Sequence, residues 1–321
     1  MARAGVVTDL LATRAREAPT SVGVYFILGA ENELLYIGKA AKLNRRLRDH
    51  AREGDASPIW RKVPSAVQEV KWIECADERE AVCREADLIM ALAPTFNKTM
   101  TINDTFVYVA VERMSTPHAR KIRLRLSDRR GEAGSKEYGA FPQLGKGKVS
   151  WPAVRSNAGY AALLRLIWVA FSASELKSRL PSRLHGSSPP VDHTTSFDPS
   201  ADKPLHEFLS GRSLRLLEML REGALSTEMI EYMRPSLERD LESAKEFFEL
   251  GPRALRDLRL RNSLSRAGAI DRDTFSAVMR REVQNEIGEF AVKPPRADDH
   301  HLRRAARSTQ LRNARRRIAE S

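Results

Sequence analysis

Two tyrosines near the start of the chain each stand two residues from a glycine. Tyr25 follows Gly23, and Tyr36 precedes Gly38, in two short apolar segments. Side chains alternate along a strand, so we expect both tyrosines on the same face of a hairpin. A glycine beside a phenol removes a side chain and gives a ligand room to approach. Taken alone, the pattern fits equally a pair of tyrosines that pack on the hairpin.

A single carboxylate interrupts an apolar helix face further along the chain. Glu85 shares helical spacing with Ala81, Leu88 and Leu92. A charge on a packing face is costly unless it is paired or bound to a metal, so we expect either an arginine partner or a metal ligand. One carboxylate, completed by waters and phosphate oxygens, satisfies Mg²⁺. Asn97, twelve residues later, is expected to anchor a phosphate or its own loop.

Cations line the segment between the tyrosines and Glu85. Lys42, Arg46 and His50 recur at four-residue spacing beside an apolar seam, and Arg45 adds a further charge. Residues 39–62 hold eight cations and three acids. Such a stripe suits a phosphate backbone, and it is also compatible with an ordinary solvated helix face.

The elements that would position these residues form a small α+β domain. Predicted strands occupy 22–28, 34–38 and 67–75, and predicted helices occupy 42–53 and 77–93. The strands are rich in β-branched and aromatic residues or alternate in polarity, and the helices show four-residue apolar spacing or a capping signal. The resulting β-β-α-β-α order is typical of an α+β domain.

Further patterns divide the whole chain into five expected parts. They are the α+β domain at 15–100, an α/β extension at 101–185, a linker at 186–204, a mainly helical region at 205–292 and a basic tail at 293–321. The extension shows two strand patterns and a long apolar helix pattern at 151–173. The linker is assigned because it is rich in Pro, Ser and Asp. Seven arginines lie between Arg303 and Arg317 of the tail, and Glu320 follows them.

Composition restricts the class of protein. The chain has 321 residues and a net charge of +12, and 41 of its 54 basic residues are arginine. Arginine pairs two-pronged with phosphate, so a polyanionic partner is expected. Two cysteines exclude a disulfide framework and a cysteine zinc site. No apolar run reaches bilayer length, and no secretory signal is evident at the start, so we expect no membrane partner.

In their order and spacing, these residues resemble the GIY-YIG nuclease family, most closely the N-terminal half of its UvrC branch and the short UvrC homologue Cho. The matching segments are Gly23-Val24-Tyr25, Leu34 to Ala40, Arg46, Glu85 to Ile89, Pro94 to Asn97, Asn103 to Phe106, Tyr138 to Pro142 and Phe208 to Arg212. The resemblance is specific over 19–142 and thin beyond 204. It implies a small nuclease domain with a further extension.

The resemblance also implies roles for the site residues. Glu85 would bind one Mg²⁺ or Mn²⁺ ion, Arg46 would neutralise the scissile phosphate, and Asn97 would hold the substrate or the loop on the metal side. A tyrosine would deprotonate the attacking water. We favour Tyr36 as this base and Tyr25 as the residue that positions the water, and the reverse assignment stays open. Free tyrosine has a pKa of about 10, so the metal and Lys39 would have to lower it.

The implied activity is a metal-dependent, structure-specific endonuclease that nicks one strand of damaged or structured double-stranded DNA in nucleotide excision repair. A UvrB-like helicase is the implied partner, and the implied location is cytoplasmic and nucleoid-associated. Residues expected to contact DNA are Lys42, Arg45, His50, Arg303, Arg304, Arg315 and Arg316. The alternatives are a mobile-element, homing or restriction nuclease, a non-catalytic DNA-binding protein, or an RNA-associated protein.

Four departures from UvrC accompany the resemblance. The length leaves no room for the second nuclease domain, and the cysteine cluster found in many UvrC proteins is missing from 178–190. Position 50 is His where many relatives have Tyr. The stretch from Leu237 to Leu258 is faintly similar to the helical hairpin with which UvrC contacts UvrB, but Gly251-Pro252 is expected to interrupt it.

Overall fold

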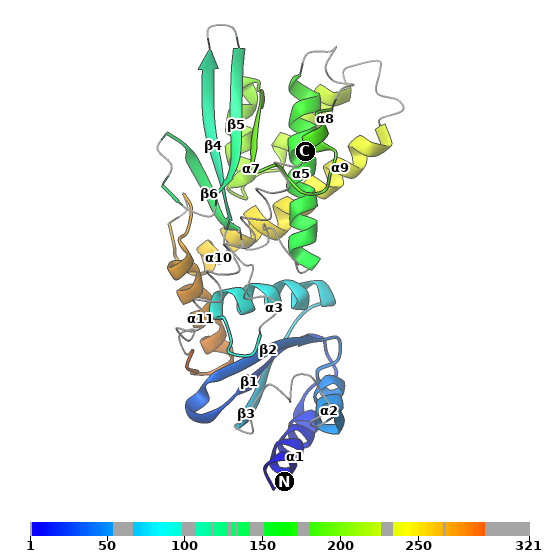
Figure 1. Cartoon of the computed structure of the whole chain (residues 1–321), viewed down its shortest axis with the longest axis vertical. Helices are drawn as coiled ribbons and strands as arrows, with labels where there is room; N and C mark the ends of the chain where they lie inside the picture. The colour runs from blue at the N-terminus through cyan, green and yellow to red at the C-terminus, as the bar shows by residue number, and fades with distance from the viewer. Residues whose placement is uncertain are drawn as a thin grey trace, which may run out of the picture. The chain divides into compact units, whose positions relative to one another are not determined.

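The computed structural model divides the chain into two compact units (Figure 1). The first consists of residues 1–102 and 279–321, and the second of residues 103–278. The described residues are 2–53, 67–97, 107–116, 119–127, 130–131, 134–141, 151–172, 180–225, 234–265 and 268–292. The predicted basic tail, with Arg303, Arg304, Arg315 and Arg316, lies outside them.

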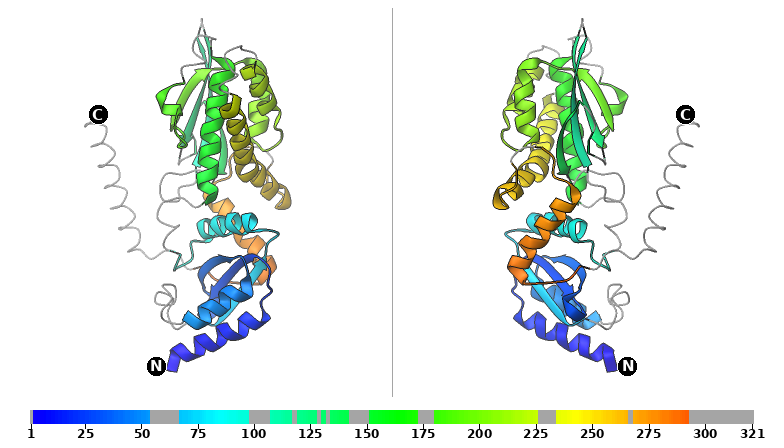
Figure 2. Two further views of the ribbon diagram at one scale, coloured as in Figure 1. Left: turned by 90° about the vertical axis from the view of Figure 1, so that its right-hand side faces the viewer. Right: turned by 90° about the vertical axis from the view of Figure 1, so that its left-hand side faces the viewer.

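The first unit contains a three-stranded antiparallel sheet with the strand order β2-β1-β3. Its elements are α1 (Ala2–Glu17), β1 (Gly23–Leu28), the short 3₁₀ helix η1 (Ala30–Asn32), β2 (Leu34–Ala40), α2 (Leu43–Glu53), β3 (Glu69–Glu74) and α3 (Glu78–Leu92). The predicted β-β-α-β-α order is confirmed, and α1 was not predicted. Helices cover both faces of the sheet, with α1 and α2 packed together on one side and α3 on the other (Figure 2).

Local sequence accounts for the ends of α3. Asp77 caps the helix by accepting a hydrogen bond from the Glu80 N–H at 2.8 Å, and the Glu80 carboxylate accepts from the Ala76 N–H at 2.7 Å. This is the reciprocal arrangement expected of a capping box. The helix ends at Ala93, whose left-handed backbone (φ 45°) precedes Pro94. The cap at Asp77 and the end at Ala93 therefore determine the bounds of α3 and the position of Glu85 within it.

The second unit is built on a four-stranded antiparallel sheet with the strand order β6-β4-β5-β7. Its strands are β4 (Val107–Thr116), β5 (Ala119–Ser127), β6 (Lys136–Phe141) and β7 (Asp192–Ser196). Its helices are α5 (Trp151–Phe171), η3 (Ser182–Leu184), η4 (Pro199–Ala201), α7 (Asp202–Leu209), α8 (Arg215–Leu225), α9 (Arg234–Phe248), a π-helix (Glu249–Arg253), α10 (Ala254–Arg261) and the start of α11 (Arg272–Ile287).

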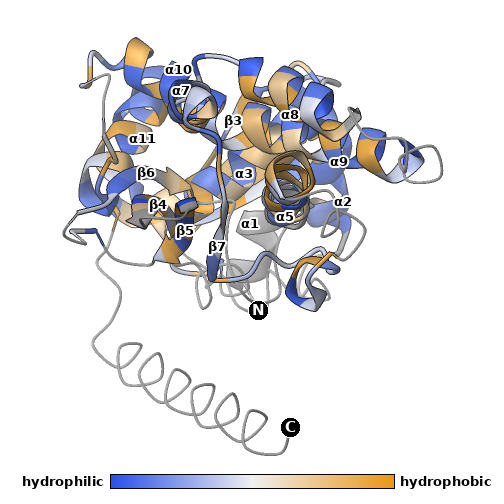
Figure 3. Cartoon of the chain, turned by 90° about the horizontal axis from the view of Figure 1, so that it is seen from above, coloured by the Kyte–Doolittle hydropathy of each residue, from blue (hydrophilic) through white to orange (hydrophobic). Residues whose placement is uncertain are grey.

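The long helix α5 packs against α9, α8 and β7. Figure 3 views it nearly end-on, with its apolar residues in orange. Its buried positions include Tyr160, Leu163 and Ile167. Among the described residues, no helix combines the length and the apolar character needed to cross a bilayer.

The expected linker at 186–204 differs from the structure. Residues 192–196 form β7, which pairs with β5 and buries His193 and Thr195 on its inner side. In the sequence, these two residues alternate with Asp192 and Thr194, a pattern that is typical of a strand. The many Pro and Ser residues around it led us to predict a linker instead. The expected extension and most of the expected helical region accordingly lie in one compact unit.

The predicted interruption at Gly251-Pro252 is also corrected. A π-helix over Glu249–Arg253 carries Pro252 between α9 and α10. The wider turn of a π-helix accommodates a residue that cannot donate the regular α-helical hydrogen bond. Apolar residues of this stretch, including Phe247, Phe248 and Leu258, are buried within the second unit.

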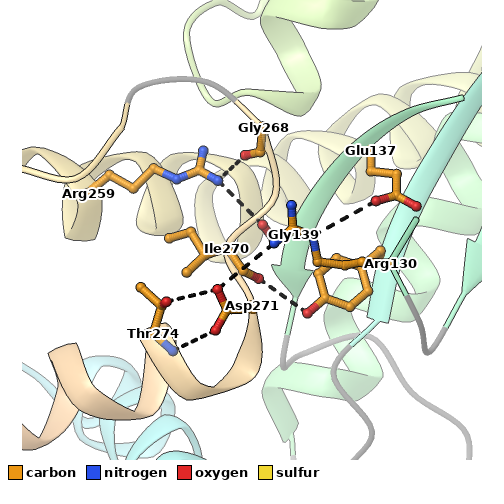
Figure 4. Close-up of polar contacts among 9 residues, drawn as sticks. Arg130, Glu137, Gly139, Arg259, Gly268, Ile270, Asp271 and Thr274 are labelled. Atoms are coloured by element: carbon orange, nitrogen blue, oxygen red, sulfur yellow. Dashed lines mark hydrogen bonds and ion pairs between the residues drawn. The ribbon is translucent and has the colours of Figure 1, made fainter. Parts of the chain in front are cut away.

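A buried arginine fixes the loop before α11 to the sheet (Figure 4). Arg259 donates to the carbonyl of Gly139 at 3.4 Å and to the carbonyl of Gly268. The same Gly139 carbonyl accepts from the Ile270 N–H at 2.8 Å. Burial lowers the pKa of Arg259, and carbonyl oxygens partly compensate its charge. The network thus sets the point at which α11 begins.

Candidate functional site

Strand β2 lies at the edge of its sheet, and polar groups from later in the chain bind its outer backbone atoms. Asn97 accepts from the Ile37 N–H at 2.8 Å and donates to the Ile37 carbonyl at 2.7 Å. The Glu85 carboxylate accepts from the Lys39 N–H at 2.9 Å. These bonds satisfy an edge that would otherwise be open, and they hold the backbone on either side of Gly38 in place. Asn97 therefore ties its own loop to strand β2.

The residues after α11 cover the start of the same edge. The Leu34 N–H donates to the Ala291 carbonyl at 2.8 Å, and the Ala291 N–H donates to the Asn32 carbonyl at 2.9 Å. Lys71 of β3 donates to the Ile287 carbonyl at 2.7 Å. Sequence reasoning missed this attachment because a single backbone bridge leaves no pattern of residue types. The residues that follow α11, up to residue 292, therefore belong to the same compact unit as the two tyrosines.

Tyr25 and Tyr36 lie side by side, as the alternation predicted, with ring centroids 6.1 Å apart. Tyr25 is 1% exposed, whereas Tyr36 is partly exposed. Burial raises the pKa of both phenols above the usual value of 10, and the negative charge of Glu85 raises them further. Arg46 opposes this rise at both tyrosines. Both phenols are therefore neutral near pH 7 in the protein alone.

His50 was expected to contact DNA, and the structure corrects this. Its side chain is 0% exposed, and its Nε2 lies 2.9 Å from the Tyr25 hydroxyl. The two rings meet edge to face at 5.7 Å. Burial lowers the pKa of His50 to about 4, with Arg46 contributing in the same direction. The ring is thus a neutral partner of Tyr25 inside the protein.

Glu85 is only partly exposed, whereas Ala81, Leu88 and Leu92 on its helix face are buried, as the spacing predicted. Desolvation raises the pKa of Glu85, although the Lys39 N–H and the Lys39 charge oppose the rise. In the described part of the chain, no three His, Cys, Asp or Glu side chains gather as a metal cluster. A desolvated carboxylate with its Oε1 bound to a backbone N–H fits the binding of one hard cation that keeps most of its waters.

Lys39 does not act where we expected it. Its Nζ lies 4.0 Å from Glu78, and its charge affects the pKa of Glu85. The cation that opposes the rise in the pKa of Tyr36 is Arg46. The positive charge that acts on the two phenols therefore comes from α2 rather than from β2.

The space left by the missing side chains of Gly23 and Gly38 is filled by neighbouring groups of the protein, and not by a ligand as we expected. A Cβ at Gly38 would lie 2.5 Å from the Tyr25 hydroxyl oxygen and 2.8 Å from Cε1 of Tyr36. A Cβ at Gly23 would lie 2.3 Å from the Ile73 carbonyl oxygen. Gly38 is thus the position that lets the two phenols converge, and Gly23 lets β1 approach β3.

The remaining expected DNA contacts are exposed. Arg45 lies on the solvent side of α2, 4.0 Å from Asp49, and Lys42 is exposed just before the helix begins. Both are available to an anionic partner.

Comparison with known proteins gives concordant matches. A family model described as the UvrC-like GIY-YIG domain matches residues 21–98. The UvrABC system protein C of Rhodopseudomonas palustris (strain ATCC BAA-98 / CGA009) is 30% identical over 234 residues, which is 72% of this chain and 32% of that protein. The protein of the same name from Synechocystis sp. is 37% identical over 106 residues, which is 32% of this chain and 17% of that protein.

A solved structure is also similar. It is the GIY-YIG N-terminal endonuclease domain of UvrC from Thermotoga maritima, a point mutant bound to its catalytic divalent cation. The identity is 30%, the match covers 27% of this chain and 93% of that one, and the TM-score is 0.25. The chain spans about a third or less of the length of the curated relatives it matches.

Proposed function

Residues 21–98 belong to the UvrC-like GIY-YIG endonuclease domains, and from this premise we propose that the chain is a metal-dependent DNA endonuclease that nicks one strand in nucleotide excision repair. The observation that carries the proposal is the convergence of four side chains at one end of β2. Tyr25 and Tyr36 share a face, the charge of Arg46 on α2 acts on both phenols, and Glu85 of α3 binds the backbone of β2.

Hydrolysis of a phosphodiester requires an activated water, neutralisation of the phosphate oxygens and stabilisation of the leaving oxygen. Glu85 is the residue that would hold a divalent cation, Mg²⁺ or Mn²⁺, through its carboxylate. Such a cation, when bound, supplies Lewis-acid stabilisation of the phosphate and the leaving oxygen. Arg46 adds a fixed positive charge beside the phenols and neutralises the non-bridging oxygens.

The difference in exposure between the tyrosines decides which one meets water. Tyr36 is partly exposed, so its hydroxyl can contact an attacking water, whereas Tyr25 is 1% exposed and cannot. We therefore assign the general base to Tyr36. Tyr25 holds the Tyr36 hydroxyl in place through a hydrogen bond between the two hydroxyls.

The proposed substrate is double-stranded DNA that is damaged or structured, with Lys42 and Arg45 contacting its backbone. A UvrB-like helicase remains a proposed partner on the ground of the relatives' name alone. The stretch from Leu237 to Leu258 gives it little support, because its apolar side chains are buried within the second unit.

Glu85→Gln tests the proposal. The variant keeps an oxygen for the Lys39 N–H and loses the charge, so we expect nicking of supercoiled plasmid in Mg²⁺ to fall by at least about 10³-fold. Affinity for DNA, measured without metal, should change less than about threefold, because no cation of the protein is removed.

The matched control is Glu78→Gln. It makes the same chemical change on the same helix at a side chain that is 70% exposed. Its nicking rate should stay within about twofold of the wild type, since surface charge pairs contribute little. Equal losses in the two variants, or retained nicking in Glu85→Gln, would rule out the assignment of Glu85.

A further inference from the structure

Two segments that the proposed function does not use meet in the second unit. They are Tyr138 to Phe141 in β6, and Phe208 to Arg212, where α7 ends. Each segment packs a phenylalanine on Phe247 of α9, with ring centroids 6.0 Å apart for Phe141 and 6.2 Å apart for Phe208. All three rings are buried, so this shared core fixes the two segments relative to each other.

Polar groups next to this core form a connected cluster. The Tyr138 hydroxyl is hydrogen-bonded to Nδ1 of His206, and the two rings stack with centroids 5.8 Å apart. Nε2 of His206 lies 3.6 Å from the Asp202 carboxylate, which also accepts from Nε of Arg113 at 2.9 Å. Tyr138 is buried and His206 is partly exposed, so the pair of rings lies just beneath the surface.

Three positive side chains from separate elements act on His206. They are Arg113 of β4, Lys136 of β6 and Arg212, which follows α7. Burial lowers the pKa of His206 to about 4, and all three cations contribute in the same direction. The charge of Arg212 also acts on Tyr138. His206 is therefore neutral at pH 7, and the positive charge of the cluster comes from the three cations.

One of these three charges is neutralised within the protein. Arg113 forms an ion pair with Asp202. In the part of the chain that the structure describes, no carboxylate forms an ion pair with Lys136 or Arg212, and both side chains are exposed. The carboxylate of Glu207 pairs instead with a lysine one turn before it on α7. Two uncompensated charges of the same sign repel each other, so an anion that binds both would relieve the repulsion.

The position of Arg212 is fixed by its own loop. Gly211 has a left-handed backbone with φ 72°, and a Cβ there would lie 2.3 Å from the Pro252 carbonyl oxygen. The loop therefore lies directly against the π-helix. The Ser210 hydroxyl accepts a hydrogen bond from Nε of Arg212 at 2.9 Å. Because Nε is occupied, the two terminal nitrogens are the donors left to bind an anion two-pronged.

We propose that Lys136 and Arg212 form a phosphate-binding site in the second unit, and that its ligand is a backbone phosphate of DNA. Phosphate fits because an arginine fork matches two of its oxygens and a lysine adds a point charge. Two exposed cations hold a single free ion weakly, whereas the same contact within a duplex adds to others. The choice of DNA rests on the proposed function, and the phosphate site does not.

The salt dependence of DNA binding tests the site. The double variant Lys136→Gln/Arg212→Gln of the full chain removes both cations, and thermal unfolding should be unchanged because both side chains are exposed. We expect the slope of log affinity against log salt concentration to fall by about one, since one phosphate contact is lost. Measured without metal at ~0.1 M salt, affinity for a duplex should fall about tenfold.

Lys203→Gln/Arg221→Gln is the matched control. It removes the same charge from two side chains of the second unit that are 86% and 56% exposed and lie outside the cluster. Its slope should change by less than about 0.3. Nicking at saturating DNA should stay within about twofold of the wild type in both double variants, because the catalytic residues are intact. Equal losses of slope in the two variants would mean that only net charge matters, and would overturn the proposal.

The ring of His206 reports on the site without any activity. In NMR spectra of the full chain with nitrogen-15-labelled histidine, His206→Gln assigns its signal. At constant ionic strength, we expect this signal to shift with inorganic phosphate and, at lower concentration, with a short undamaged duplex. In Lys136→Gln/Arg212→Gln it should shift with neither ligand.

The outcomes separate the phosphate site from the proposed function. A His206 signal that shifts with neither ligand, or that shifts equally in the double variant, would overturn the proposal. A shift with inorganic phosphate alone would keep the site and overturn DNA as its ligand. A wild-type chain that cuts no DNA but shows both shifts would refute the proposed function and leave the phosphate site standing.

Discussion

Gly38→Ala is the smallest change that the structure predicts to separate the two phenols. The added Cβ would lie 2.5 Å from the hydroxyl oxygen and 2.6 Å from Cζ of Tyr25, and 2.8 Å from Cε1 of Tyr36. Restoring an ordinary 3.4 Å contact requires the Tyr25 hydroxyl to move by about 0.9 Å. Tyr25 is fully enclosed, so the strain cannot be relieved by swinging the ring into solvent.

Two magnitudes follow from this displacement. Overpacking of a core by one methyl costs ~1–3 kcal/mol of the free energy of unfolding. A shift of about 0.9 Å displaces the Tyr25 hydroxyl from the position in which it contacts His50 at 2.9 Å, and misplacement by about 1 Å costs about 10²-fold in rate. We therefore expect a folded protein, somewhat less stable, with nicking about 10²-fold slower.

The assay is the nicking rate of supercoiled plasmid in Mg²⁺ together with urea unfolding. Gly186→Ala is the matched control, because its Cβ would meet nothing closer than the Ser188 nitrogen at 3.8 Å. The control should leave both quantities unchanged. A Gly38→Ala variant with wild-type nicking would refute the reasoning that Gly38 exists to admit the phenols.

Three further changes follow from the described contacts. Asp77→Ala should cost ~1 kcal/mol of the free energy of unfolding, because the Glu80 N–H loses its acceptor; an unchanged urea midpoint would contradict this. His193 is fully buried, and burial lowers its pKa to about 4. Between pH 6.5 and pH 4 the unfolded chain binds a proton at this residue and the folded chain does not, so the free energy of unfolding should fall by ~3 kcal/mol as the pH falls through this range. His193→Leu should make the free energy of unfolding less dependent on pH there, and an unchanged pH dependence would contradict the role of His193. Ala291→Pro removes the N–H that binds Asn32 and should cost ~1 kcal/mol in urea unfolding; no loss would mean that residues 288–292 do not hold the edge of β2.

Local patterns predicted much of the first unit. Alternation placed Tyr25 and Tyr36 on one face, and helical spacing placed Glu85 on the same helix face as buried Leu88, because these rules depend only on neighbours in sequence. The candidate residues around β2 were found for the same reason. The domain match over 21–98 agrees with this part of the interpretation.

Features that depend on distant partners could not be predicted. His50 is buried because α1 and β1 cover α2, and its spacing with Lys42 and Arg46 looked like an exposed stripe. Strand β7 forms because β5 offers an edge to Asp192–Ser196, a pairing that spans about seventy residues. Arg46, rather than Lys39, tunes the phenols because the hairpin and α2 meet in three dimensions.

Mapping of cuts on end-labelled duplexes tests the central claim most directly. The full chain would be incubated with a duplex bearing one bulky lesion and with the same duplex undamaged, in Mg²⁺ and in chelator. The account predicts one nick in one strand of the lesion-bearing duplex, abolished by chelator and by Glu85→Gln. Equal cutting of the undamaged duplex, or cutting that survives loss of the Glu85 charge, would contradict it.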